Sequence, residues 1–232
     1  RLLYNAAENF EIRISSIDGG SLRNAIPRES VAIIAVDENQ KAAFEADFTD
    51  MAAAIHGEYA SLEKELELSI KQIDLDDNVM SLESQAQFLK AIYAAHNGVY
   101  RMSPDIADLV ETSNNIARVI VKDGSIKIGC LTRSSVDSSK DDLANTLTAT
   151  FELAGFDVAL SGDYPGWAPN MDSAILKVLE AKYKEINNEA PHVAACHAGL
   201  ECGILGQNYP EMDMISFGPT IKGAHSPDER AS

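Results

Sequence analysis

The chain has 232 residues, of which 45% are hydrophobic and 24% are charged, an ordinary composition for a globular protein. Its formal net charge is −17, and because such an acidic surface repels phosphate backbones, the charge argues against nucleic-acid binding. No apolar run approaches the roughly 20 residues of a membrane span, and no secretory signal is recognisable, so we expect a cytoplasmic protein that does not bind membranes.

The part of the chain before residue 100 carries strand and helix patterns. Apolar–polar alternation or a continuous apolar run predicts a strand, and apolar residues at steps of three or four predict a helix. Asp18-Gly19-Gly20 predicts a turn, and Ser81 is a suitable helix cap. The expected strands are residues 10–17, 31–36 and 66–73, and the expected helices run from Phe44 to Leu62 and from Ser81 to near Asn97.

A hairpin is the strongest local signal in the middle of the chain. Two apolar runs, residues 116–121 and 125–131, flank Asp123-Gly124, a pair that favours a tight turn because both residues must reach positive φ. Ser138, followed three residues later by Asp141, resembles a capping box at the start of a helix. The elements expected after the hairpin are that helix, which Gly155 ends, a strand over residues 156–160 and a helix over residues 173–187.

The order of these elements predicts two related α+β halves, each with an antiparallel sheet and helices packed on one face. Beyond Pro165–Asn170, a stretch rich in structure breakers, we expect short buried strands at residues 193–196 and 214–217. We therefore expect two domains, residues 1–165 and residues 166–232. The chain has no initiator methionine and no closing helix, so we expect it to be part of a longer protein.

Arginines in two places could hold an anion. Asn24 lies in a loop between Arg23 and Arg28, and Arg133 ends the second strand of the hairpin. Arginine can clamp a carboxylate with two parallel hydrogen bonds. Loop arginines are more often simply solvated, so both interpretations stay open at this point.

Two glycine-containing segments follow the expected late strands. His197–Gly203 could line a crevice at a strand-to-helix junction, or could need its glycines for sterics alone. Ile215–Glu229 carries His225 beside acidic residues, and a neutral imidazole oriented by carboxylates is a good zinc ligand, although an exposed loop histidine is the alternative. A structural zinc site on Cys196, His197 and Cys202 would lack a second ligand pair, so we expect free thiols.

Three segments together resemble the aminoacyl-histidine dipeptidases of the M20 metallopeptidase family: Leu22–Glu29, His197–Gly203 and Ile215–Arg230. The resemblance implies a catalytic domain with two zinc ions and an inserted lid domain that forms a homodimer and helps to bind the dipeptide substrate. Residues 1–165 would be most of the lid, and residues 166–232 the C-terminal part of the catalytic domain.

The same resemblance implies roles for four residues. His225 would be a zinc ligand, and Arg133 would hold the substrate carboxylate. Asn24 would lie near the substrate, and Gly199 would line the same pocket with its backbone. His197 and Glu201 stand in the second motif, but the resemblance assigns no role to either.

The chain also departs from the family pattern. M20 enzymes take their other zinc ligands and general base from an early His-x-Asp pair and an adjacent Glu-Glu pair, and neither pair precedes the lid in this sequence. We therefore expect a fragment of a zinc-dependent dipeptidase for Xaa-His dipeptides that is inactive alone. The alternatives are a non-catalytic dimerisation module with the lid fold, and a degenerate relative that binds a small molecule.

Overall fold

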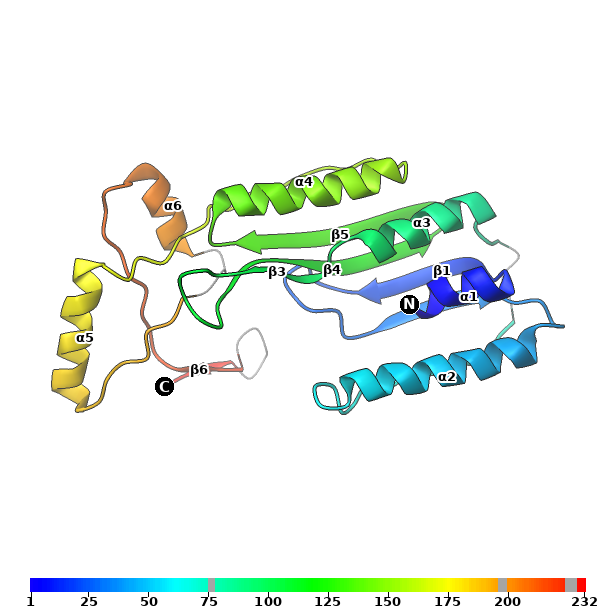
Figure 1. Ribbon diagram of the computed structural model, residues 1–232, viewed down its shortest axis with the longest axis horizontal. Coiled ribbons are helices and arrows are strands. Elements are labelled where there is room, and N and C mark those ends of the chain that lie inside the picture. The colour runs from blue at the N-terminus through cyan, green and yellow to red at the C-terminus, as the bar shows by residue number, and fades with distance from the viewer. Residues whose placement is uncertain (75–77, 196–199, 224–228) are drawn as a thin grey trace. The chain divides into compact units, whose positions relative to one another are not determined.

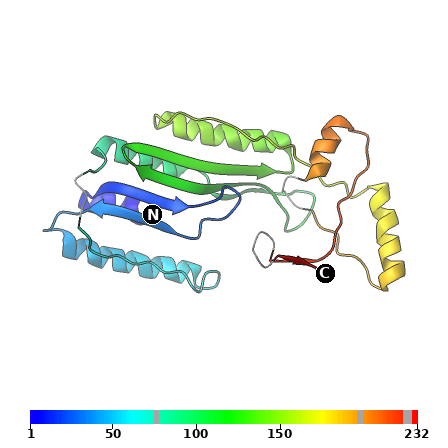
Figure 2. The same ribbon diagram turned by 180° about the vertical axis from the view of Figure 1, so that it is seen from behind.

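A computed structural model describes residues 1–74, 78–195, 200–223 and 229–232 of the chain, and Figure 1 and Figure 2 show it from opposite sides. The helices are α1 (Leu2–Phe10), α2 (Lys41–Tyr59), α3 (Leu82–Ala94), α4 (Asp137–Leu153), α5 (Ala174–Asn187) and α6 (Glu201–Asn208). The strands are β1 (Arg13–Gly20), β2 (Ser30–Ala35), β3 (Gly98–Met102), β4 (Val110–Lys122), β5 (Ser125–Ser134), β6 (Ile221–Lys222) and β7 (Arg230–Ala231).

The main sheet has five strands, and β1 pairs antiparallel with both of its neighbours. Its order is β2-β1-β4-β3, and β5 pairs with β4. Strand β1 runs antiparallel to β2 and to β4, with Ile17 opposite Val121, and a bulge interrupts its register with β2 between Ile14 and Ser16. The hairpin predicted at Asp123-Gly124 is confirmed, because these residues have φ of 50° and 72° and join β4 to β5.

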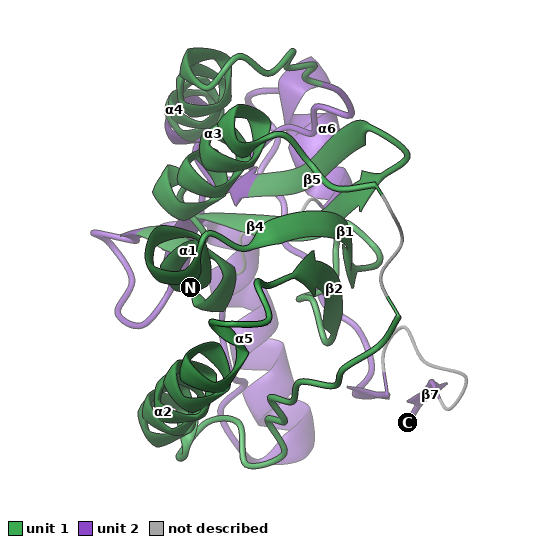
Figure 3. Cartoon of the chain, turned by 90° about the vertical axis from the view of Figure 1, so that its right-hand side faces the viewer, with its two compact units in different colours: residues 1–100, 113–132, 141–160 green, residues 101–112, 133–140, 161–232 purple. Residues whose placement is uncertain are grey.

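The core lies between one face of this sheet and the helices α1, α3 and α4 (Figure 3). Ile14, Ile17 and Val121 from the strands pack with Phe88 and Leu89 from α3. A second buried cluster, on α3 and α4, is Ala91, Ala95, Leu143, Leu147 and Phe151. The predicted fold class, an antiparallel sheet with helices packed on one face, is therefore confirmed.

Serine caps begin two helices, and the one predicted from the sequence, at Ser81, is confirmed. The Ser81 hydroxyl accepts a hydrogen bond from the Ser84 amide at 3.1 Å and so caps α3. The Ser173 hydroxyl does the same for the Leu176 amide and caps α5. The capping box predicted at Ser138 is wrong, because α4 already begins at Asp137 and Ser138 lies inside the helix.

Several predicted strands are absent from the part of the chain that the structure describes. Residues 66–73, 156–160, 193–195 and 214–217 form no ladder there. Phe156 and Val158 do pack against the core, so their alternation reflects burial without a strand partner. Asp18–Gly20 is the opposite error: the expected turn is the end of β1, where Asp18 pairs with Val31. The predicted repeat of two similar halves is not found among the described elements.

The chain divides into two compact units, coloured green and purple in Figure 3. Unit 1 comprises Arg1–Tyr100, Ser113–Thr132 and Asp141–Leu160, and unit 2 comprises Arg101–Thr112, Arg133–Lys140 and Ser161–Ser232. Each unit is therefore built from segments that are distant in sequence. Across the described ranges, no helix is both long enough and apolar enough to cross a membrane.

Candidate functional site

Arg133 is the expected substrate-binding residue whose surroundings are best defined. It is the penultimate residue of β5, belongs to unit 2 and is half-buried. Successive side chains of a strand point to opposite faces of the sheet. Its neighbour Ser134 contacts Thr112, which in turn contacts Ser139 of α4, so Arg133 points to the face of the strand away from α4.

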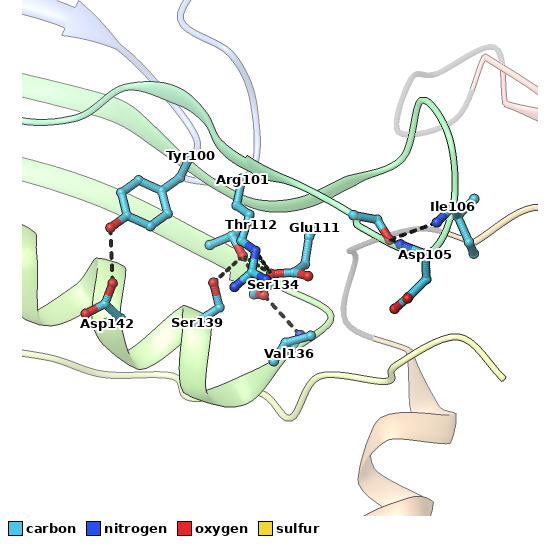
Figure 4. A network of polar contacts seen from close by, with 11 residues as sticks. Tyr100, Arg101, Asp105, Ile106, Glu111, Thr112, Ser134, Val136, Ser139 and Asp142 are labelled. Carbon is cyan, nitrogen blue, oxygen red and sulfur yellow. Dashed lines mark hydrogen bonds and ion pairs between the residues drawn. The ribbon is translucent and has the colours of Figure 1, made fainter.

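A buried cluster of hydroxyl groups lies behind Arg133, on the α4 side of the strand (Figure 4). The Thr112 hydroxyl is 2.8 Å from the hydroxyls of both Ser134 and Ser139, and it donates to a carboxylate oxygen of Glu111 at 3.3 Å. A hydroxyl has one donor and two acceptor positions, so the three contacts use all of them. The cluster ties the ends of β4 and β5 to the first turn of α4.

Glu111 brings a negative charge to this cluster. Its side chain is 6% exposed, and the Arg101 guanidinium on β3 lies 3.3 Å from one carboxylate oxygen. A buried carboxylate is costly unless it is paired and hydrogen-bonded, and here Arg101 and Thr112 provide both. The ion pair therefore belongs to the support of the strand ends.

The turn that follows Arg133 is held by hydrogen bonds that its backbone amides donate. The Ser135 amide donates to the Glu111 carbonyl at 3.1 Å, and the Val136 amide donates to the Ser134 hydroxyl at 3.0 Å. Because Ser134 and Ser135 directly follow Arg133, both bonds restrict where the Arg133 backbone can lie. In the described part of the chain, the Arg133 guanidinium itself has no ion-pair partner.

Residues 163–166 approach the same turn from the C-terminal side. Lys140 of α4 donates to Asp163, to the Tyr164 carbonyl and to Asp137, which in turn accepts a hydrogen bond from the Gly166 amide at 2.8 Å. The Gly166 amide and, to a lesser extent, Lys140 lower the pKa of Asp137. Burial alone would lower the pKa of Lys140, but its hydrogen bonds to Asp163 and Asp137 raise it overall.

Asn24 lies in unit 1, in the loop between β1 and β2, and is exposed. The loop begins with a turn in which the Ala25 amide donates to the Leu22 carbonyl at 3.1 Å. Asn115 on β4 donates from its side-chain amide to the Ala25 carbonyl at 2.7 Å and to the Arg23 carbonyl at 3.2 Å. Asn115 thus holds the backbone on both sides of Asn24 and leaves the Asn24 side chain outward.

The other residues that the motifs singled out lie in the C-terminal part of the chain. Gly199, His197 and His225 lie outside the described residues. Glu201 begins α6 and is exposed. The described ranges contain no group of three or more His, Cys, Asp or Glu side chains that could hold a metal ion, so they do not by themselves fit a complete metal site.

Sequence patterns missed most of the groups that surround Arg133. Thr112, Glu111 and Lys140 look like ordinary surface residues of strands and helices, and burial reveals their importance only in three dimensions. One usable signal was present: four serines within one short stretch, Ser134, Ser135, Ser138 and Ser139, around a helix start. Such residues prefer helix caps and turns, which is where Ser134 acts.

Comparison with known proteins shows that the chain is similar to two dipeptidases. The chain matches no protein-family model. It is 38% identical over 230 residues to the cytosol non-specific dipeptidase of Escherichia coli, a match that covers 99% of the chain and 47% of that protein. It also superimposes on the crystal structure of aminoacylhistidine dipeptidase from Vibrio alginolyticus with a TM-score of 0.91 and 36% identity, over 100% of the chain and 47% of that structure.

The chain therefore spans about half the length of the relatives that it matches. The resemblance to the aminoacyl-histidine dipeptidases, which the three sequence motifs indicated, is confirmed over the whole chain.

Proposed function

We propose that the protein containing this chain, as a relative of the aminoacyl-histidine dipeptidases, hydrolyses dipeptides, and that Arg133 holds the substrate's C-terminal carboxylate. The likeness to two dipeptidases over essentially all of the chain supports the proposed activity. Because the chain corresponds to 47% of each relative, the activity is proposed for the whole protein, and these 232 residues are proposed to be inactive alone.

The observation that carries the role of Arg133 is its unused positive charge on a firmly held strand end. Glu111 already occupies Arg101, and Asp18 already pairs with Arg118, but no described carboxylate neutralises Arg133. A half-buried guanidinium that no described side chain pairs with suits the planar, two-oxygen geometry of a carboxylate. A substrate with a free C-terminal carboxylate would supply the missing partner and would favour short peptides.

Further features of the proposal rest on the resemblance alone. We propose zinc as the metal, with His225 as one ligand, and Asn24 and Gly199 as further groups at the substrate. We also propose Xaa-His dipeptides among the substrates, a homodimer formed through residues 1–165, and a cytoplasmic location. Since the described residues fit no complete metal site, no chemical step is assigned to zinc.

A comparison of two arginine and lysine variants tests the proposal. In the whole protein, Arg133→Met should lower kcat/KM for dipeptides about 10²–10³-fold, the typical effect of removing one partner of a desolvated charge pair. Lys127→Met is the matched control, because Lys127 lies on the same face of β5, is exposed and should tolerate the change. The assay is release of amino acids from Xaa-His and other dipeptides with zinc present.

Dipeptide amides provide the sharper measurement, because they lack the carboxylate that Arg133 would bind. The unmodified protein should prefer the dipeptide acid to the amide, and Arg133→Met should remove that preference. If the whole protein cleaves no dipeptide, the activity is wrong, and the chain is better explained as a binding module. If Arg133→Met keeps the preference for the acid, the activity stands but Arg133 is not its carboxylate-binding group.

A further inference from the structure

Lys140 is the most completely bonded lysine for which the structure gives contacts. Its side chain is only 12% exposed. The ammonium lies 2.7 Å from a carboxylate oxygen of Asp163, 2.7 Å from the Tyr164 carbonyl and 2.9 Å from a carboxylate oxygen of Asp137. An ammonium has three N–H donors, and these three oxygens can occupy all of them. By contrast, Lys182 pairs with Glu185 in an exposed position, with 62% of the lysine side chain accessible.

The three oxygens come from two segments that the chain separates widely. Asp137 starts α4, directly after the turn that follows Arg133, whereas Asp163 and Tyr164 belong to the returning segment, residues 163–166. We call the contact of Lys140 with Asp137, Asp163 and Tyr164 the lysine clasp. It bonds the returning segment to the first turn of α4, and all of its residues lie in unit 2.

Gly166 shows how closely the returning segment lies against the turn. A methyl group on Gly166 would be 2.6 Å from the Ser135 carbonyl oxygen and 3.2 Å from that of Ser134. Only glycine leaves room for this approach, because both neighbours are backbone atoms that cannot rotate away. The Gly166 amide also donates to Asp137, so the same segment both covers the turn and bonds to it.

We infer that Lys140 is a positioning residue for Arg133. The lysine clasp fixes the start of α4, and this holds the turn that directly follows Arg133 at the end of β5. Lys140 makes no contact with substrate in this scheme and acts through the backbone of residues 134–137. The inference rests on the proposed function, in which Arg133 binds the substrate carboxylate. It adds that the returning segment, and not the strand alone, determines where that guanidinium lies.

The hydroxyl cluster and the lysine clasp restrain the strand end from different sides. Ser134 is bonded to Thr112 on the α4 side, and Asp137 is bonded to Gly166 of the returning segment and to Lys140 of α4 itself. Removing the clasp would leave the hydroxyl cluster intact, so the turn should remain folded but move more freely. A displaced guanidinium would bind the carboxylate less well in the ground state and in the transition state alike, so KM should rise while kcat changes little.

The test uses the whole protein and separates binding from chemistry. Lys140→Met keeps a side chain of similar length and removes the three hydrogen bonds. It should raise KM for a dipeptide about tenfold or more, while kcat changes less than about twofold. Lys182→Met is the matched control and should leave both constants unchanged. Lys140→Arg keeps the positive charge, so its KM should lie between those of the unmodified protein and Lys140→Met.

The Arg133→Met background provides the measurement that a merely structural lysine would not affect. If Lys140 acts through Arg133, Lys140→Met should have no further effect on kcat/KM in that background, because interacting residues are not additive. Gly166→Ala is a second, independent variant: it keeps Lys140 but forces the Ser135 carbonyl away, and it should raise KM in the same way.

Each outcome points in one direction. An unchanged KM in both Lys140→Met and Gly166→Ala, in a protein that cleaves dipeptides and depends on Arg133, overturns the inference alone. If Lys140→Met lowers kcat/KM equally in the unmodified protein and in the Arg133→Met background, the inference is also overturned, because Lys140 would then act on general stability. An inactive unmodified protein overturns the proposed function, and this inference with it.

Discussion

Gln85 offers the sharpest test of how the fold is held, because its side chain behaves like part of a strand. It lies on α3 and is 3% exposed. Its amide nitrogen donates to the Ile12 carbonyl and its amide oxygen accepts from the Ile14 amide, both at 2.7 Å. Strand β4 pairs with β1 only from Ile17 onward, so these two backbone groups have no strand partner on that side. Gln85 supplies it.

Gln85→Met removes both hydrogen bonds and keeps nearly the same side-chain volume. A typical hydrogen bond contributes about 0.5–1.5 kcal/mol, and a buried backbone group left without a partner costs about 1–3 kcal/mol. Ile12 and Ile14 are fully buried, so water does not readily replace the amide. We therefore expect the free energy of unfolding to fall by about 3 kcal/mol, which is a large share of the roughly 5–15 kcal/mol of an ordinary domain.

Urea denaturation followed by far-ultraviolet circular dichroism measures this loss, and Gln87→Met is the matched control, because Gln87 is exposed on the same helix. The midpoint should shift for Gln85→Met with little change in the m-value, and hydrogen exchange should accelerate at the Ile14 amide. A loss below about 1 kcal/mol, or equal losses in both variants, would refute the view that the glutamine completes the strand.

Two further predictions concern backbone space and pH. Gly20 has a φ of +72°, and Gly20→Ala places a methyl group 1.9 Å from the Ala117 carbonyl oxygen, so it should destabilise the chain by about 3 kcal/mol or more. Gly57→Ala, in open space within α2, should instead stabilise the chain by about 0.5–1 kcal/mol. Urea denaturation compares the two variants. The Gly166 amide lowers the pKa of Asp137 in the folded chain. The ionised Asp137 carboxylate therefore contributes to the free energy of unfolding above the unfolded aspartate pKa of about 4, and this contribution is lost as pH falls through the lower folded pKa. Asp137→Asn should therefore weaken the acid dependence of the unfolding free energy, and an unchanged pH profile contradicts this.

Elements with strong local signals were predictable from the sequence. The Asp123-Gly124 turn and the Ser81 and Ser173 caps each depend on a few adjacent residues, so the chemistry that forms them is visible in a short window. The apolar run at residues 31–36 also became a strand, β2, because a neighbour was available in β1.

Strand prediction failed where the sequence could not reveal a partner. Residues 156–160 alternate as a strand should, and Phe156 and Val158 are partly buried, yet no described strand pairs with them. Strand β3 shows the reverse: all five residues of Gly98–Met102 are exposed, so burial does not mark it, and pairing within the sheet makes it a strand. A ladder needs a partner as well as a pattern.

The proposed site divides along the same line. The family resemblance implied roles for Asn24 and Arg133, but it carried no information about what holds either residue. Asn115 and Lys140 do this with side-chain bonds to backbone carbonyls, and such bonds leave no recognisable spacing in the sequence. Asp137 and Lys140 alone resemble an ordinary surface pair on one helix turn. Their role emerges only when Tyr164, 24 positions further along, is found against the same ammonium. Residues that position a binding group are therefore the part of this site that sequence motifs are least able to identify, and variants of Lys140 are the direct way to measure them.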